Sequence, residues 1–139
     1  MVSDRQQGRN FPLQRTDEEW RRMLTPEQYD VMRRHGTERP GSCALLVEKR
    51  HGAFSCAGCG QELFRSAGKF ESGTGWPSFT EPVPGSVETS VDRSYGMTRT
   101  EVHCANCGSH LGHVFDDGPP PSHHRYCING VALNFEPKA

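Results

Sequence analysis

Apolar residues recur at helical spacing in two short segments near the start of the chain. Thr16 stands three residues before Glu19, which is the spacing of a capping box at the first turn of a helix. Thr25 and Gln28 repeat this spacing, and Gly36 is a natural stop for the second segment. The pattern therefore predicts two short helices. The side chains expected to face the core are Trp20, Met23, Leu24, Tyr29 and Met32.

After residue 36 the pattern changes to short apolar or alternating runs broken by glycine, proline and serine. Such runs are typical of β-strands joined by tight turns. At 139 residues the chain is long enough for about one domain, at ~150 residues per domain. We expect a mainly β domain over 16–139 with short N-terminal helices, preceded by a flexible polar arm over 1–15. The expected strands are 44–47, 53–56, 96–103, 112–115, 125–128 and 131–135.

The charge balance excludes several classes of partner. Sixteen basic and seventeen acidic side chains give a net charge of −1, so no strong field would attract nucleic acid or an anionic membrane. The apolar runs are too short for a transmembrane helix, and no charged-then-apolar signal peptide opens the chain. We therefore expect a cytoplasmic protein, and a monomer, that binds neither nucleic acid nor membrane.

Four of the six cysteines form two matched C-x-x-C pairs. Cys56 and Cys59 make the first pair, Cys104 and Cys107 make the second, and each pair is followed by a glycine. Such knuckles point two thiolates at one ion, and two of them complete a tetrahedral zinc site. A secreted disulfide framework lacks a signal peptide, and a thioredoxin-type redox pair fits two matched knuckles poorly. The spacing predicts a closed, structural zinc that clamps the ends of the 44-residue segment between the knuckles.

The two remaining cysteines have different surroundings. Cys127 lies two residues from Arg125, so both side chains would project from the same face of a strand. A positive charge there would favour the thiolate, which is the nucleophilic form. Cys43 follows a turn-like stretch and is expected to be exposed and mobile. Either cysteine could equally be an inert, small apolar residue of the core.

Further polar and aromatic residues cluster between the second knuckle and Cys127. His110 and His113 are candidates for proton transfer near neutral pH, or they are ordinary surface histidines. With Cys127 they could instead bind a catalytic zinc that keeps one position open. Trp76, in the glycine-rich stretch 73–79, could form a flat apolar wall of a site or fill the core. The other histidines, His35, His51, His103, His123 and His124, are expected on the surface.

Together these clusters resemble a family. The order is C-x-x-C, KFESGTGWPSF (69–79), CxxCGSHLGHVFDDGP (104–119) and RYCINGVALNF (125–135), with LTPEQYDVMRRHGTERP (24–40) before them. This combination resembles the B-type methionine-R-sulfoxide reductases from about residue 16 to residue 137. The resemblance implies an antiparallel, tent-like β core with short N-terminal helices. It also implies a structural zinc held by Cys56, Cys59, Cys104 and Cys107.

The resemblance further implies an enzyme and the roles of its residues. Cys127 would attack the sulfur of methionine-R-sulfoxide, peptide-bound or free, and become a sulfenic acid. Trp76 would hold the substrate's methyl group. The other residues matching the family's active site are His110 and His113 as proton donors or oxygen binders, Asp117 as the orienting group, Arg125 as the partner of the thiolate, and Asn129 as a positioning group.

Thr74 occupies the position where many family members carry the cysteine that resolves the sulfenic acid. Cys43 is the remaining free thiol, so it is the candidate for resolving Cys127, with thioredoxin reducing the disulfide. Direct reduction of Cys127 by an external thiol is the alternative. A different class of function is also open, namely a non-enzymatic zinc-knuckle domain that binds a protein partner. In that case Cys127, His110 and Trp76 would be core or interface residues.

Overall fold

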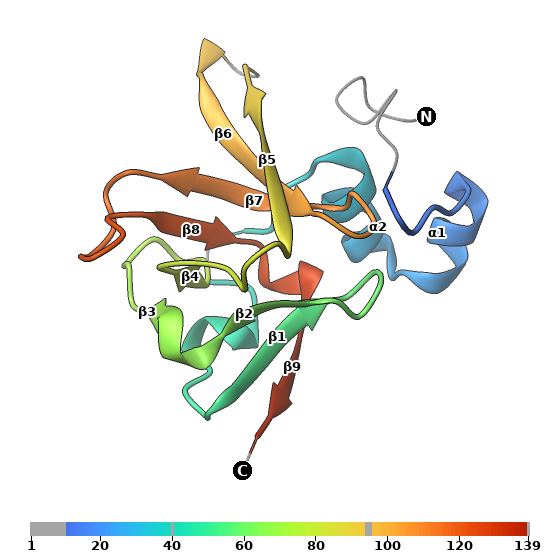
Figure 1. The fold of residues 1–139 in the computed structure, drawn as a ribbon. Coiled ribbons are helices and arrows are strands. Elements are labelled where there is room, and N and C mark those ends of the chain that lie inside the picture. Colours follow the sequence, from blue (N-terminus) through green and yellow to red (C-terminus); the bar gives the residue numbers. More distant parts are fainter. Residues whose placement is uncertain (1–10, 40, 94–95, 139) are drawn as a thin grey trace.

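A computed structural model describes residues 11–39, 41–93 and 96–138 (Figure 1). Within them, two antiparallel sheets share one hydrophobic core, and two short helices lie at one end. The expected mainly β architecture is confirmed. The three-stranded sheet has the order β2-β1-β9, and the six-stranded sheet has the order β3-β4-β8-β7-β6-β5. The strands are β1 (Gly52–Cys56), β2 (Glu62–Arg65), β3 (Lys69–Phe70), β4 (Ser78–Phe79), β5 (Val87–Asp92), β6 (Arg99–Cys104), β7 (His110–Phe115), β8 (Arg125–Ile128) and β9 (Leu133–Pro137).

Both helices begin at the predicted capping boxes. Helix α1 (Asp17–Met23) is capped by Thr16, and helix α2 (Pro26–Arg34) is capped by Thr25, with reciprocal bonds to the third helical residue in each case. Trp20 and Met32 are buried, as expected. Met23 was expected to face inward but is exposed, because α1 ends at this residue and turns it away from the core.

The strand predictions locate β1, β6, β7, β8 and β9, and they miss β2, β3, β4 and β5. β8 has the predicted bounds, while β6, β7 and β9 differ by two or three residues at one or both ends. The run Ala44–Val47 is a 3-10 turn, η1, rather than a strand, and Val47 is exposed. A four-residue apolar run cannot distinguish a strand from a turn by periodicity alone.

Aromatic side chains join the two sheets. The ring of Phe64 in β2 stacks on Phe79 in β4 with centroids 4.4 Å apart, and Phe54 in β1 meets the same ring at 5.1 Å. All three side chains are fully buried. Because each buried phenylalanine contributes about 2 kcal/mol or more of apolar burial, this contact holds the small sheet against the large one.

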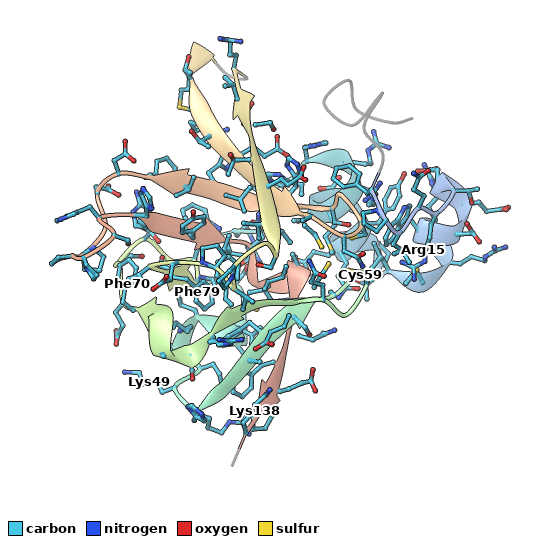
Figure 2. All side chains as sticks on the ribbon, viewed as in Figure 1. Arg15, Lys49, Cys59, Phe70, Phe79 and Lys138 are labelled. Carbon is cyan, nitrogen blue, oxygen red and sulfur yellow. The ribbon has the colours of Figure 1, made fainter. Side chains whose placement is uncertain are left out.

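The segment before α1 packs against the two cysteine knuckles. The backbone N–H of Leu13 donates to the carbonyl of Asn106, and Arg15 donates to the carbonyl of Gly58. In Figure 2, Arg15 and Cys59 lie close together at this end of the molecule. Residues 1–10 of the expected flexible arm lie outside the described residues, whereas residues 11–15 are tied to the knuckles by these two bonds.

Candidate active site and metal centre

The four paired cysteines converge on one point between the sheets. Cys56 ends β1 and Cys104 ends β6, and each strand turns into a knuckle that carries its second thiol. The sulfurs of Cys56 and Cys107 are 3.7 Å apart, and those of Cys59 and Cys104 are 3.6 Å apart. All four ligand atoms lie within 4.8 Å of one another. Tetrahedral thiolates at 2.3 Å from a zinc ion would be about 3.8 Å apart, so the donor set fits such an ion.

The turns of the knuckles depend on their glycines and on nearby donors. Gly60 and Gly108 have φ values of 83° and 77°, in the left-handed region that glycine adopts without strain. The N–H of Gly58 points at the sulfur of Cys56 at 3.4 Å, and the Arg33 guanidinium donates to the carbonyl of Cys107 at 3.0 Å. These donors offset the negative charge that four thiolates bring together.

A separate cavity of about 270 Å³ opens around Cys127. Cys127 lies in β8, between Ser78 of β4 and His113 of β7, in the middle of the six-stranded sheet. The sheet thus presents the thiol on a rigid surface rather than on a loop. The predicted site residues that line this cavity are Trp76, His113, Arg125, Cys127 and Asn129.

Burial and hydrogen bonding act on the Cys127 thiol in opposite directions. Burial raises its pKa, while the Thr74 hydroxyl, whose oxygen is 3.8 Å from the sulfur, and the Arg125 guanidinium act to lower it. Burial has the larger effect, so the pKa of Cys127 lies above its ordinary value. Arg125 does lower the pKa of Cys127, as expected, but its effect is smaller than that of burial.

Arg125 is held by a two-pronged ion pair. Its Nε and Nη2 donate to the two carboxylate oxygens of Asp117 at 2.9 and 3.1 Å, and its guanidinium lies 4.4 Å over the ring of Phe115. This geometry fixes the arginine beside Cys127. Asp117 was expected to orient the histidines, but its carboxylate is exposed and pairs with Arg125.

The two histidines occupy different layers of the site. His113 lines the cavity, and its Nε2 lies 2.8 Å from Asp92. Burial lowers the pKa of His113, although Asp92 opposes this. His110 is buried behind it, with ring centroids 5.5 Å apart, and its Nδ1 lies 2.8 Å from Glu101. The structure therefore brings one histidine to the cavity and places the second against it from behind.

Glu101 also contacts His35 at 3.2 Å, so two imidazoles share one buried carboxylate. His35 and His103 were expected on the surface, but His103 is buried and His35 packs against His110. In the described residues, Cys127 does not group with His110 and His113 as metal ligands; the groups found are the four cysteines and His35–Glu101–His110. The hydrolase alternative with a second zinc on Cys127 has no support in this geometry.

One acidic residue ties Trp76 and Asn129 together. The indole N–H of Trp76 donates to the backbone carbonyl of Glu38 at 3.0 Å. The backbone N–H of Glu38 donates to the side-chain oxygen of Asn129 at 2.9 Å, and the Asn129 amide donates to the carbonyl of Leu111. Trp76 and Asn129 are therefore oriented by backbone groups rather than by each other.

Cys43 lies outside this cavity. It is half-buried at the start of η1, and burial raises its pKa. Its sulfur faces Gly130, and it lines another cavity, of about 440 Å³, that shares no lining residue with the cavity of Cys127. The expectation of an exposed cysteine is wrong, because η1 packs against the 3-10 turn η4 (Gly130–Ala132).

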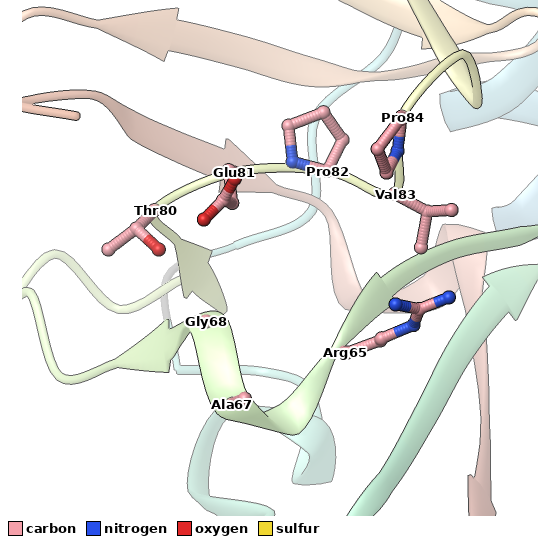
Figure 3. A pocket seen from close by; sticks show the side chains of 8 residues that line it. All are labelled: Arg65, Ala67, Gly68, Thr80, Glu81, Pro82, Val83 and Pro84. Atoms are coloured by element: carbon pink, nitrogen blue, oxygen red, sulfur yellow. The ribbon is translucent and has the colours of Figure 1, made fainter.

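Several residues of the site could not be found from the sequence. Asp92, Glu101 and Glu38 reach their partners across 21, 9 and 91 residues, and no motif marks them. A further cavity of about 290 Å³ lies beneath residues 80–84 (Figure 3). Its lining includes Arg65 and Glu81 but no thiol or imidazole, so it lacks the chemistry of the Cys127 site.

The chain matches proteins of one family along almost its whole length. The SelR domain model matches residues 24–137. A peptide methionine sulfoxide reductase MsrB of Leifsonia xyli is 58% identical over 130 residues, which cover 92% of this chain and 94% of that protein. Proteins of the same name from Methanosarcina barkeri and Agrobacterium fabrum are 57% and 53% identical, over 89% and 90% of this chain and 88% and 93% of theirs. In the part of the chain that the structure describes, no helix is long and apolar enough to cross a membrane. The chain belongs to the SelR-domain family of peptide methionine sulfoxide reductases of the MsrB type.

Proposed function

We propose that the chain reduces methionine-R-sulfoxide in oxidised peptides and proteins to methionine, with Cys127 as the nucleophile. The observation that carries this proposal is the cavity in which a thiol on a rigid strand meets an indole, an imidazole and a guanidinium. A non-enzymatic binding domain would have no need of this set of groups around a thiol. The reductases named above share more than half of the chain's residues and support the same chemistry.

In the first step the Cys127 thiolate attacks the sulfoxide sulfur. The sulfoxide oxygen gains negative charge, takes a proton and passes to the cysteine sulfur. Methionine leaves, and Cys127 becomes a sulfenic acid, so that two electrons move from the cysteine to the substrate. His113 is the proton donor, since it lines the cavity and pairs with Cys127 in the neighbouring strand. His110 supports His113 from behind, and Arg125, fixed by Asp117, stabilises the thiolate.

Trp76 supplies the selectivity for one sulfur epimer. Its indole plane is anchored by the bond to Glu38, so it can hold the terminal methyl of the substrate in one place. With the methyl group fixed, only the R epimer presents its sulfur to Cys127 and its oxygen to the histidine. Asn129, anchored by Glu38 and Leu111, positions polar groups at the same wall.

In the second step Cys43 attacks the sulfenic acid, and thioredoxin reduces the resulting disulfide. A disulfide needs Cα atoms within about 7 Å of each other, and the two thiols open into different cavities. The Cys43 sulfur must therefore move toward Cys127. Direct reduction by an external thiol would not require this movement.

The four clustered cysteines would hold a structural zinc ion. Cys56, Cys59, Cys104 and Cys107 would supply four thiolate ligands, the number that a structural zinc site uses. When bound, the ion would supply a clamp between the two sheets and no redox chemistry.

A single turnover without reductant tests the function. Separated R and S epimers of a methionine sulfoxide peptide are mixed with the reduced enzyme, and methionine formed and thiols lost are counted per chain. We expect one methionine from the R epimer and none from the S epimer, with two thiols lost. If neither epimer yields methionine, the proposed function fails and the zinc-knuckle binding domain becomes the better interpretation.

A further inference from the structure

A buried carboxyl group near Cys43 has an oxygen without a hydrogen-bond partner among the described residues. The side chain of Glu38 is almost fully buried, with 3% of the residue exposed. Its Oε1 accepts a bond from the backbone N–H of Val131 at 2.9 Å. Its Oε2 is buried and has no hydrogen-bond partner among the described residues. A buried carboxylate oxygen without a partner is costly, so its placement invites a functional explanation.

Cys43 and the open oxygen of Glu38 face the same point. A methyl group placed on Gly130 would lie 2.4 Å from the Cys43 sulfur and 3.5 Å from Glu38 Oε2. The negative charge of Glu38 also contributes to raising the pKa of Cys43, as expected for neighbouring groups. Glycine at position 130 leaves open a space that both the thiol and the carboxylate border.

The Cys43 thiol needs a base in order to act. Attack on a sulfenic acid requires a thiolate, but burial raises the pKa of this thiol, and no cation in the described part of the chain lowers it. The other charged groups around its cavity are Glu27, Glu48 and Arg50. Arg50 is engaged by Glu48 at 2.9 Å, and Glu27 is a second acid that adds negative charge. Glu38 is the carboxylate that borders the same space beside Gly130 as the Cys43 thiol.

We propose that Glu38 accepts the proton of the Cys43 thiol when Cys43 resolves the sulfenic acid of Cys127. This inference rests on the proposed function, in which Cys43 is the resolving cysteine. As the proton moves to the carboxylate, the Cys43 sulfur bonds to the Cys127 sulfur and the S–O bond of the sulfenic acid breaks. The hydroxide that leaves takes a proton from solvent and departs as water, and Glu38 then returns its proton to solvent, so one disulfide and one water form from one thiol and one sulfenic acid.

Burial also brings the pKa of the Glu38 carboxyl closer to that of a thiol. Burial raises the pKa of the Glu38 carboxyl, although the bond from the Val131 N–H and the nearby Gly130 backbone oppose this. A base whose pKa lies closer to that of the thiol accepts its proton at a smaller free-energy cost. Only the carboxylate form can act, so the resolving rate should rise with pH as Glu38 loses its proton.

The variant Glu38→Gln separates this role from the structural one. The bonds from Glu38 to Trp76 and Asn129 use its backbone, and the glutamine oxygen can still accept from Val131. In a single turnover, methionine release reports the first step and loss of the second thiol reports disulfide formation. We expect Glu38→Gln to slow disulfide formation by about a hundredfold, and far more than it slows methionine release. The rise of the resolving rate with pH should also disappear.

Glu38→Asp, which keeps a carboxylate, should recover part of the resolving rate. The inference is overturned if Glu38→Gln forms the disulfide at the wild-type rate, or if both steps slow equally. It is also overturned if a folded Glu38→Asp, judged by its thermal transition, resolves no faster than Glu38→Gln.

Cys43→Ser distinguishes failure of this inference from failure of the proposed function. In that variant we expect methionine to form while Cys127 stalls as a sulfenic acid, trapped by dimedone. If Cys43→Ser still loses a second thiol as fast as the wild type, Cys43 does not resolve Cys127, and the role of Glu38 falls with it.

Discussion

At the scale of single residues, the environment of Cys127 predicts a thiol that is mostly protonated in the free enzyme. Burial raises its pKa more than Thr74 and Arg125 lower it. In the Cys43→Ser background, we expect the alkylation rate of Cys127 by iodoacetamide to rise with pH through a pKa above about 8.5. Arg125→Met should move this pKa higher still, because the variant removes the positive charge beside the sulfur. A plateau of the alkylation rate that extends below pH 7 would contradict this account.

Thr74 provides a second prediction at the same scale. Its hydroxyl oxygen is 3.8 Å from the Cys127 sulfur and 2.8 Å from the hydroxyl of Ser72. A cysteine at this position could form a disulfide with little backbone movement. We expect Cys43→Ser/Thr74→Cys to lose two thiols in one turnover, whereas Cys43→Ser alone loses one. Mass spectrometry of the peptide pair would identify the bond, and its absence would show that the 73–75 turn holds the new thiol away.

At the scale of elements, strands β6 and β7 are joined by a buried ion pair as well as by their ladder. Burial alone would raise the pKa of Glu101, but bonds from His110 and His35 hold it well below its ordinary value. Glu101→Gln should lower the free energy of unfolding by about 3 kcal/mol, because both imidazoles lose their carboxylate inside the protein. Glu88→Gln in the neighbouring strand is the matched control. Glu88 is half-exposed, and its carboxylate lies 3.8 Å from His103. The Glu88→Gln change should therefore alter the free energy of unfolding by no more than about 0.5 kcal/mol.

Urea unfolding at several pH values tests the sign of this effect. A carboxyl whose pKa is depressed on folding stabilises the protein above its unfolded pKa of about 4.3 and loses that contribution as the pH falls further. The difference in the free energy of unfolding between wild type and Glu101→Gln should therefore have its full size near pH 6 and become smaller below about pH 4. A difference that grows on acidification would rule out the ion pair as its source.

The elements also explain what the sequence could and could not predict. Capping boxes are local signals, so both helices could be placed at Thr16 and Thr25. The cysteine knuckles are local as well, and their convergence followed from metal chemistry. In contrast, the backbone N–H of Glu38 meets the side chain of Asn129 across 91 residues, and no periodicity reports such a contact. The burial that raises the pKa of Cys127 likewise depends on the pairing of β4, β8 and β7.

At the scale of the whole molecule, the four cysteines join the two sheets at one end of the core that the sheets share. Cys56 belongs to the three-stranded sheet and Cys104 to the six-stranded sheet, and residues 11–15 pack over both knuckles. His110 begins β7 only three residues after Cys107, so the knuckle also fixes the start of the strand that carries both site histidines.

Removal of the metal should therefore unfold the protein rather than merely inactivate it. Structural zinc contributes about 10–16 kcal/mol of apparent binding free energy, comparable to the whole stability of a typical domain. We expect one zinc per chain by elemental analysis, and loss of the cooperative thermal transition after chelation under reducing conditions. Cys59→Ser should lose both the metal and the transition, while Cys43→Ser, the matched control outside the cluster, keeps both. If the metal-free chain kept the thermal transition of the holoprotein, the aromatic contact of Phe64 with Phe79 would suffice to join the sheets, and the cluster would not be their clamp.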